Sequence, residues 1–427
     1  MRCVSGARHA RGGLCPHRCK LVCNHAAERN DVAVNGRKRS TLADLGREPF
    51  RIFFPAGVLA GILGVALWPL YFGGVTSFYP GQAHGRIMAY GLFGAFILGF
   101  LGTAMPRMLS APPLGTRNVL LLVCLHVATV VAFAAQRILW GDSLFLALLC
   151  VFAALMISRA RHRKDTPPPG FVLVGLAFLS VFAGTALAVL QPGTDETASR
   201  WITLQRLLSY QGFVLLPILG IGPFILPRFF GLPSPHDFPE ALAPPGAWKK
   251  KAALALGTGV LIEASFFIEA AGWFRSAHAI RFATTLVYLL LEFPFHKAPK
   301  ISNAVGASLR IAFAALVGGF IFIALFPAYR VSLLHLTLIG GFAVITFTVA
   351  TRVVFGHSGH LEKLKGRNRW LPIAVGLMLF GMATRISGDF WPQIMASHYI
   401  YGALIWIAGV LIWSSFVLPK VLQVENE

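Results

Sequence analysis

Long uncharged apolar runs constrain this chain more than any other feature. One of them, Ile87 to Met105, is nineteen residues long, begins just after His84 and Arg86, and ends before Pro106 and Arg107. A run of about 20 apolar residues spans the roughly 30 Å hydrocarbon core of a bilayer as an α-helix. The sequence therefore predicts a transmembrane helix with a histidine at its beginning.

Such runs recur along the whole chain, which is 56% hydrophobic and only 13% charged. Because soluble proteins carry about 25% charged residues, this composition predicts a polytopic membrane protein surrounded by the lipid bilayer. We expect an all-α fold with about twelve transmembrane helices, and the fourth, eighth and eleventh apolar runs are short. The runs cover residues 53–72, 85–105, 119–135, 143–157, 170–190, 207–226, 252–273, 280–295, 307–326, 333–355, 371–386 and 399–418.

Three of these stretches resemble one another. Residues 82–109, 205–231 and 335–356 each begin with polar or basic groups and contain a Gly-Phe pair. Each also carries an arginine at or just past the end of the apolar run, at Arg107, Arg228 and Arg352. This weak internal repeat predicts three groups of four helices.

The positive charge has an uneven distribution that predicts orientation. The net charge is +21, and 27 Lys and Arg residues lie in the N-terminal tail, alternate short loops and the C-terminus, against 6 in the other loops. Positively charged loops stay on the cytoplasmic side of a membrane. We therefore expect a multi-pass cytoplasmic-membrane protein with both termini cytoplasmic, and no nucleic-acid partner.

The chain divides into a basic tail, residues 1–49, and a transmembrane domain, residues 50–427. Cys15, Cys19 and Cys23 repeat every four residues in the tail, and Cys and His in a short tract are ligands for soft metals. The alternatives are a disordered cationic tail and an over-extended start of the reading frame.

Four histidines fall at one predicted membrane level. If both termini of the chain are cytoplasmic, every even-numbered helix begins at the outer face of the membrane. His84, His278, His335 and His398 lie at this level. Neutral imidazole is the commonest metal ligand, so this level is a candidate cofactor or metal site. The alternative is that each histidine is simply a polar side chain at the interface.

Glu263 is the carboxylate furthest from either interface, and such groups usually serve a proton path, a cation or a lined cavity. Glu269 and Glu292 lie nearer helix ends, where Arg275 and Lys297 are potential partners. The chain has neither a phosphate-binding glycine loop nor a GxSxG motif, so catalytic residues stay unknown and ATP-driven transport is not expected.

Three sequence elements resemble the NnrS family: EPFRIFFPAG from Glu48, LGFLGTAMPRML from Leu98, and HLTLIGGFAVITFTVATRVVFGHSG from His335. The last is the most specific, since it combines an initial His with Thr-Arg at Arg352 and Gly-His-Ser-Gly at His357. The resemblance covers about residues 48–420. It implies a twelve-helix cytoplasmic-membrane protein that contains haem and copper and is associated with denitrification and resistance to nitric oxide.

The chain departs from the family before its second helix. Many members carry His-Ala-His-Glu there, whereas this chain has Gln82, Ala83, His84 and Gly85. One potential metal ligand and one carboxylate are thus missing.

A looser resemblance links the repeat to haem-copper oxidases and nitric oxide reductases. It implies that His84 and His335, which open the second and tenth helices, hold one low-spin haem. His278 and His398 are the further metal candidates, for copper or as reserve haem ligands. The sixth helix offers Gln205 and Gln211 rather than a copper-binding histidine, so a complete reductase site is not expected.

Two classes of function remain open. The first is a haem protein of the NnrS type that binds, senses or detoxifies nitric oxide or a related molecule, with an unidentified electron donor if it turns over. The second is a secondary transporter without haem, for which repeated helices and Glu263 are also typical. A Soret absorption band would separate the two.

Overall fold

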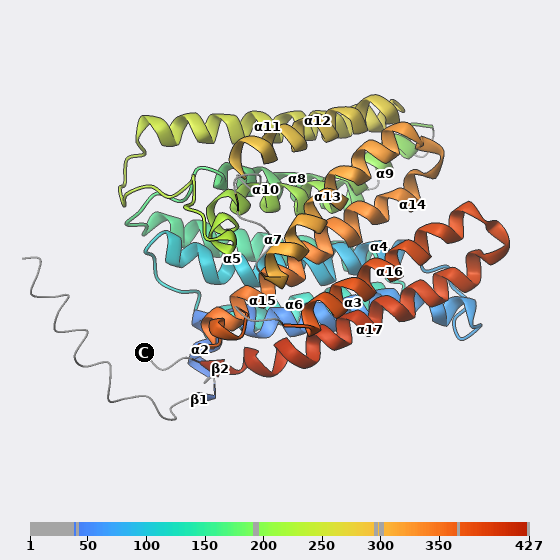
Figure 1. Ribbon diagram of the computed structural model, residues 1–427, viewed down its shortest axis with the longest axis horizontal. Coiled ribbons are helices and arrows are strands. Elements are labelled where there is room, and N and C mark those ends of the chain that lie inside the picture. Colours follow the sequence, from blue (N-terminus) through green and yellow to red (C-terminus); the bar gives the residue numbers. More distant parts are fainter. Residues whose placement is uncertain are drawn as a thin grey trace, which may run out of the picture.

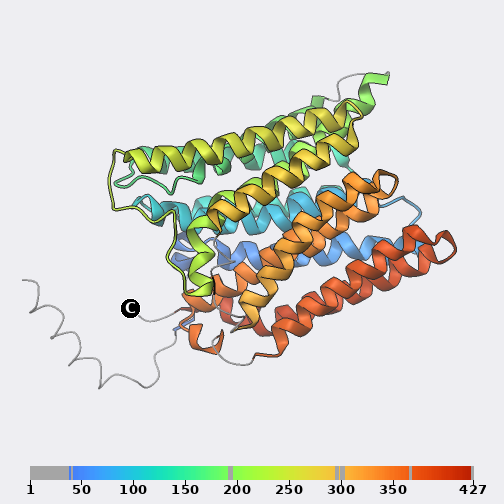
Figure 2. The same cartoon turned by 45° about the horizontal axis from the view of Figure 1, so that its top comes forward.

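The computed structural model describes residues 38–39, 42–190, 196–293, 298, 303–364 and 368–424. Nearly all regular structure within these residues is helical, which confirms the predicted all-α membrane fold. The long helices lie side by side along one common direction (Figure 1). A second view shows the same bundle from another angle (Figure 2).

Twelve helical segments run back and forth through the described part of the bundle, in the order of the twelve predicted spans. They are α3 (Phe50–Phe72), α4 (Gly81–Arg86) with η1 (Ile87–Phe93) and α5 (Gly94–Met108), α6 (Thr116–Ala134), α7 (Ile138–Arg161), α8 (Phe171–Leu190), α9 (Glu196–Arg206) with η2 (Leu207–Gly212) and α10 (Phe213–Ile225), α11 (Gly246–Ala270), α12 (Phe274–Glu292), α13 (Ala304–Leu325), α14 (Arg330–His335) with η6 (Leu336–Ala343) and α15 (Val344–His357), α16 (Trp370–Phe390) and α17 (Met395–Val421). Short 3₁₀ turns lie at Pro227–Phe230, Pro327–Tyr329, Leu361–Leu364 and Pro392–Ile394.

Eleven of these segments are long and apolar enough to cross a membrane, as judged within the described residues. The exception is α12, whose 19 residues include Arg275, His278, Arg281 and Glu292. It begins six residues before the predicted start at Ile280, because His278 and Arg281 are buried against neighbouring helices rather than left in a loop. The fourth and eleventh segments are likewise longer than their apolar runs, with 24 and 21 residues.

The second, sixth and tenth segments share one irregular feature. Each changes from α-helix to π-helix shortly after it begins, at Ile87–Phe93, Leu207–Gly212 and Leu336–Ala343, and then returns to α-helix. π-helical turns are rare and frequently occur at functional sites. The three stretches that resemble one another in sequence therefore share a backbone conformation, whereas the grouping of helices in fours stays a prediction.

These three interrupted segments lie near the centre of the bundle. Most of the apolar stretch of each is buried, 78%, 78% and 61%, against 33% for α6 and for α7. An apolar pocket of about 90 Å³ lies where α5, α10 and α15 meet, between Phe96, Ile221 and Ile345. The sequence repeat thus marks helices that are largely shielded from lipid, as α3 also is, at 61%.

The two ends of the bundle differ. At the end that we call the terminal end, β1 (Lys38–Arg39) pairs with β2 (Gln423–Val424), and α2 (Leu42–Arg47) packs against α6 (Figure 1). At the opposite, distal end, α4, α9, α14 and α17 begin. The last residues of the expected tail therefore belong to the fold, whereas residues 1–37, with Cys15, Cys19 and Cys23, lie outside the described residues.

Candidate functional site

His84 and His335 occupy matching positions at the distal end. His84 lies in α4, three residues before the π-helix η1, and His335 is the last residue of α14, directly before η6. The two side chains are close enough for His84 to contribute to the electrostatic environment of His335, and Arg385 of α16 acts on both. The structure thus brings together the two histidines that were predicted to hold a cofactor.

Both rings are fixed by the same kind of hydrogen bond. The Nδ1 atom of His84 lies 2.9 Å from the carbonyl oxygen of Gly64, and the Nδ1 atom of His335 lies 2.9 Å from that of Val331. A carbonyl can only accept, so each Nδ1 carries a hydrogen, and in the neutral imidazole each Nε2 then keeps its lone pair. No hydrogen-bond partner for either Nε2 is found among the described residues.

Arg385 is held beside these histidines by an ion pair and an aromatic ring. Its Nη1 lies 3.0 Å from Asp389 Oδ2, and its Cζ lies 3.6 Å from the centre of the Tyr399 ring. Asp389 in turn accepts hydrogen bonds from the hydroxyl of Tyr399, at 2.6 Å, and from Ser332. These bonds join α14, α16 and α17, and we call His84, His335, Arg385, Asp389 and Tyr399 the distal cluster.

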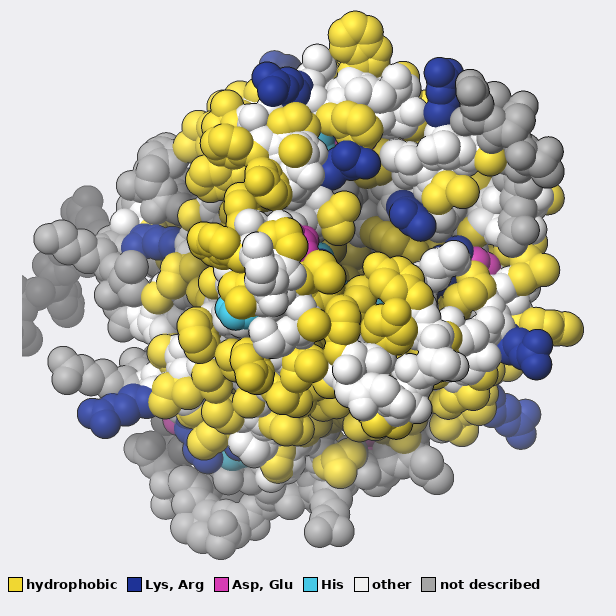
Figure 3. Space-filling model, turned by 90° about the vertical axis from the view of Figure 1, so that its right-hand side faces the viewer, with side chains coloured by type: hydrophobic (Ala, Val, Ile, Leu, Met, Phe, Trp, Pro, Cys, Tyr) yellow, Lys and Arg dark blue, Asp and Glu magenta, His cyan; other side chains and the backbone are white. Residues whose placement is uncertain are grey.

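Trp68 of α3 closes one side of the distal cluster. The centre of its ring lies 5.8 Å from that of His84 and 5.2 Å from that of Tyr399. The distal end is hollowed near its centre, with basic side chains around the hollow (Figure 3). An open pocket beside Asp389 is lined by Ala328, Tyr329, Val331, Ser332, Gly388, Pro392 and Met395.

The two further metal candidates are placed differently. His398 lies in the first turn of α17, with Nδ1 3.1 Å from the carbonyl of Ile394, so it resembles His84 and His335 locally. The Nε2 of His278 is already 3.2 Å from the carboxylate of Glu269. No group of three or more His, Cys, Asp or Glu side chains that would hold a metal ion is found in the described part of the chain.

The carboxylates of Glu269 and Glu292 have partners other than those expected from the sequence. Glu269 lies 2.8 Å from Arg281 as well as near His278, and Glu292 lies 2.8 Å from Lys251 and 2.7 Å from His236. These partners come from neighbouring helices and loops rather than from the next turn of chain. Lys297 lies outside the described residues.

Glu263 and Arg352, the other polar candidates inside spans, lie away from the distal cluster. Glu263 is in the distal third of α11 beside Ser180 and Gly212, and Arg352 places its guanidinium 5.6 Å from the ring of Phe229. Neither contacts His84 or His335 in the described residues.

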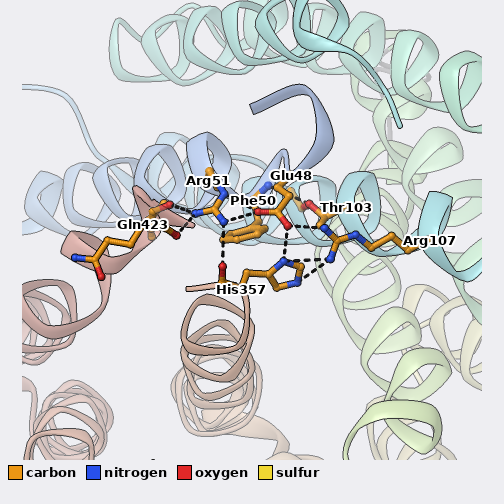
Figure 4. A network of polar contacts seen from close by, with 9 residues as sticks. Glu48, Phe50, Arg51, Thr103, Arg107, His357 and Gln423 are labelled. Atoms are coloured by element: carbon orange, nitrogen blue, oxygen red, sulfur yellow. Dashed lines mark hydrogen bonds and ion pairs between the residues drawn. The ribbon is translucent and has the colours of Figure 1, made fainter. Parts of the chain in front are cut away.

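His357 belongs to a polar network at the terminal end (Figure 4). Its Nδ1 lies 2.6 Å from Glu48, whose carboxylate also pairs with Arg51 and Arg107, each at 2.5 Å. Arg51 further donates to the backbone carbonyls of Val421 and, at 2.8 Å, of Gln423. The network therefore joins the start of α3, the ends of α5 and α15, and the C-terminal segment.

Glu48 is the charge at the centre of this network. Burial by itself raises the pKa of Glu48, but the hydrogen bond with His357 and electrostatic attraction to His357, Arg51 and Arg107 outweigh burial and lower the pKa to about 2. The carboxylate is therefore ionised at neutral pH. The network therefore pairs one largely buried, ionised carboxylate with His357, Arg51 and the more exposed Arg107.

A comparison with known families gives a match over nearly the whole chain. A sequence model described as NnrS protein matches residues 44–424. The chain belongs to the NnrS family. The match includes every residue of the distal cluster and all of the terminal network. None of the curated proteins compared with the chain matches it.

Sequence reasoning missed three members of the distal cluster in this NnrS protein: Arg385, Asp389 and Tyr399. Arg385 and Asp389 are four residues apart, a spacing that favours an ion pair on one helix face. That signal was available, but it does not show which helices face α16. The pairing with Tyr399 and the approach to His84 and His335 depend on how α16 and α17 pack.

Proposed function

We propose that this NnrS-family protein binds haem, with His84 and His335 as the two axial ligands, and takes part in the cellular response to nitric oxide. The observation that carries the proposal is the matched pair of imidazoles. Both are brought to one place at the distal end, and both have Nδ1 fixed on a backbone carbonyl.

This donor set fits a haem iron chemically. Histidines that bind metals through one ring nitrogen usually donate the other ring N–H to a carbonyl or carboxylate, which fixes the tautomer and orients the ring. The Nδ1 atoms of His84 and His335 each make such a hydrogen bond with a backbone carbonyl. When bound between two imidazoles, haem supplies one-electron chemistry.

Arg385 supports the same assignment. Haem carries two carboxylates, and Arg is the side chain best suited to pair with carboxylates because its planar guanidinium donates several hydrogen bonds. Arg385 acts electrostatically on both histidines, and its contacts with Asp389 and Tyr399 fix its position. It would balance the negative charge of the cofactor.

The role in the nitric oxide response rests on family membership and on this haem site. Binding of copper is a proposal separate from binding of haem. His398 is the histidine that resembles the haem ligands in its local geometry, whereas His278 is engaged with Glu269.

The test is the visible spectrum of the purified protein. We expect a Soret band in the wild type and loss of most bound haem in His84→Ala and in His335→Ala. His162→Ala is the matched control, because His162 also places Nδ1 2.9 Å from the carbonyl four residues earlier, at Ser158, but is exposed and does not belong to the distal cluster. Full haem content in both cluster variants would overturn the ligand assignment, and a wild type without a Soret band would favour the transporter.

The biological part is tested in cells. Nitric oxide should slow the growth of a strain that lacks the gene, and the wild-type gene and His162→Ala should restore growth. His84→Ala should not restore it. Equal growth of the deletion strain and its parent under nitric oxide would contradict the proposed role.

A further inference from the structure

Glu263 is a partly buried carboxylate that the proposed haem site does not use. It lies seven residues before the distal end of α11, about 10 Å deep at 1.5 Å per residue. Its Oε1 atom is buried and has no hydrogen-bond partner among the described residues. A carboxylate oxygen that is buried without a partner inside a membrane is costly, so this position calls for a physical explanation.

The surroundings of Glu263 are set by Gly212 in the π-helix η2. A Cβ atom at Gly212 would lie 2.2 Å from Ser180 Oγ and 3.0 Å from Glu263 Oε1. Only glycine therefore lets α8 and α11 bring these two oxygens against η2. The π-helical turn thus forms the floor of a small polar site made by three helices.

The hydrogen of Ser180 is already in use at this site. The Ser180 hydroxyl donates to the carbonyl oxygen of Leu208 at 3.1 Å, so its oxygen is left only to accept. An ionised Glu263 is also only an acceptor, whereas a protonated Glu263 can donate to Ser180. The contact between the two side chains is consequently favourable when Glu263 carries a proton.

Glu269, in the same helix, is in the opposite situation. It lies 2.8 Å from Arg281 and 3.2 Å from His278, so its negative charge is balanced. Arg281 also donates to Gln211 at 3.0 Å, directly beside Gly212 in the sequence. A series of polar contacts therefore runs from Gln211 in η2 to Arg281, from Arg281 to Glu269, and from Glu269 to His278. It ends in the first turns of α12, at the distal end.

Few other charges face Glu263 among the side chains that the structure describes. Of the elements packed against α11, neither α8 nor η2 has a charged residue. The polar side chains of η2 are Ser209, Tyr210 and Gln211. The described arginines of α9, Arg200 and Arg206, are exposed. From α12, Arg281 acts electrostatically on Glu263.

We propose that Glu263 is a proton-binding site inside the bundle, linked to the distal end by Gln211, Arg281, Glu269 and His278. A proton from water at the distal end is taken up by the Glu263 carboxylate, which becomes a neutral acid that donates to Ser180. The site is separate from His84 and His335 and does not depend on haem binding.

Infrared spectroscopy of the purified protein in lipid tests the proposal. At neutral pH we expect the carbonyl stretching band of a protonated carboxylic acid, which shifts in D₂O and is absent from Glu263→Gln. The control is Glu362→Gln, because Glu362 has a side chain that is 61% exposed and should not contribute to the band. Absence of the band in the wild type, or its persistence in Glu263→Gln, would overturn the proposal.

Two further variants test the contact and the route while keeping Glu263 in place. Ser180→Ala removes the accepting oxygen, so the band should change frequency, and an unchanged frequency would contradict the hydrogen bond. Glu269→Gln should slow the exchange of hydrogen for deuterium at the band, and an unchanged rate would contradict the route. Haem content should equal that of the wild type in Glu263→Gln, which separates this proposal from the haem assignment.

Discussion

Glu48 connects parts of the chain that are far apart in sequence. Its partners Arg107 and His357 lie 59 and 309 residues away, and the side chain of its neighbour Arg51 is fully buried. Removing one partner of a buried ion pair is strongly destabilising because the remaining charge is left without compensation. The stability of the terminal end should therefore depend on this one carboxylate.

We predict that Glu48→Gln destabilises the protein at neutral pH by about 3 kcal/mol, which corresponds to a pKa lowered from 4.5 to about 2. A carboxyl group whose pKa is lower in the folded than in the unfolded protein stabilises the folded state at pH values above the unfolded pKa. This contribution is lost as the pH falls from about 4.5 towards about 2, so the two proteins should become equally stable in acid.

The measurement is the thermal unfolding midpoint in detergent as a function of pH. Glu362→Gln is the control, since its partner His360 is 3.9 Å away and the Glu362 side chain is largely exposed. A midpoint for Glu48→Gln that matches the wild type at neutral pH would show that the network does not stabilise the fold.

At the scale of elements, α16 and α17 cross at two glycines. A Cβ at Gly381 would lie 2.7 Å from the carbonyl oxygen of Gly402, and a Cβ at Gly402 would lie 3.1 Å from the backbone nitrogen of Arg385. Small residues allow membrane helices to approach this closely. The crossing sets where Arg385 lies, one turn further along α16.

Gly381→Ala should therefore separate the two helices and lower stability by about 1–3 kcal/mol, the usual cost of overpacking. Haem content should fall as well, because Arg385 would move relative to His84 and His335. Gly376→Ala is the matched control in the same helix, since a Cβ there meets nothing within 4 Å. Unfolding midpoints and Soret absorbance measure both effects, and equal values for the two variants would refute the role of the crossing.

The element boundaries show where pattern reasoning succeeds and where it stops. The start of α3 at Phe50, close to the predicted Phe53, follows from a continuous apolar run. The start of α12 at Phe274 was missed, because Arg281 and His278 are polar and yet buried between helices. Hydropathy scores each residue alone and therefore assigns such polar residues to a loop. It does not show that their partner Glu269, on the neighbouring helix α11, allows them to be buried.

At the scale of the whole molecule, both described ends of the chain lie at the terminal end, where β1 pairs with β2 (Figure 1). The charge asymmetry of 27 to 6 predicts that this end is cytoplasmic. Because the bundle alternates direction, the distal cluster would then face the opposite side of the membrane.

We predict that a reporter active only in the periplasm is inactive when fused after Glu427. The same reporter inserted after Gly74, in the loop between α3 and α4 at the distal end, should be active. The opposite pair of results would reverse the orientation, and equal activity at both positions would contradict the placement of the two ends.

The sequence by itself determined the membrane fold, the order of the spans and the shared level of His84 and His335. These features follow from the length of the apolar runs and from the alternation of helix direction, which are local properties. Only the tertiary structure decided which side chains meet across helices: Arg385 beside both histidines, Arg281 between Glu269 and Gln211, and Ser180 with Glu263 against Gly212. Hydropathy shows how deep a residue lies but not the direction in which its side chain points, and that direction is set when the helices pack.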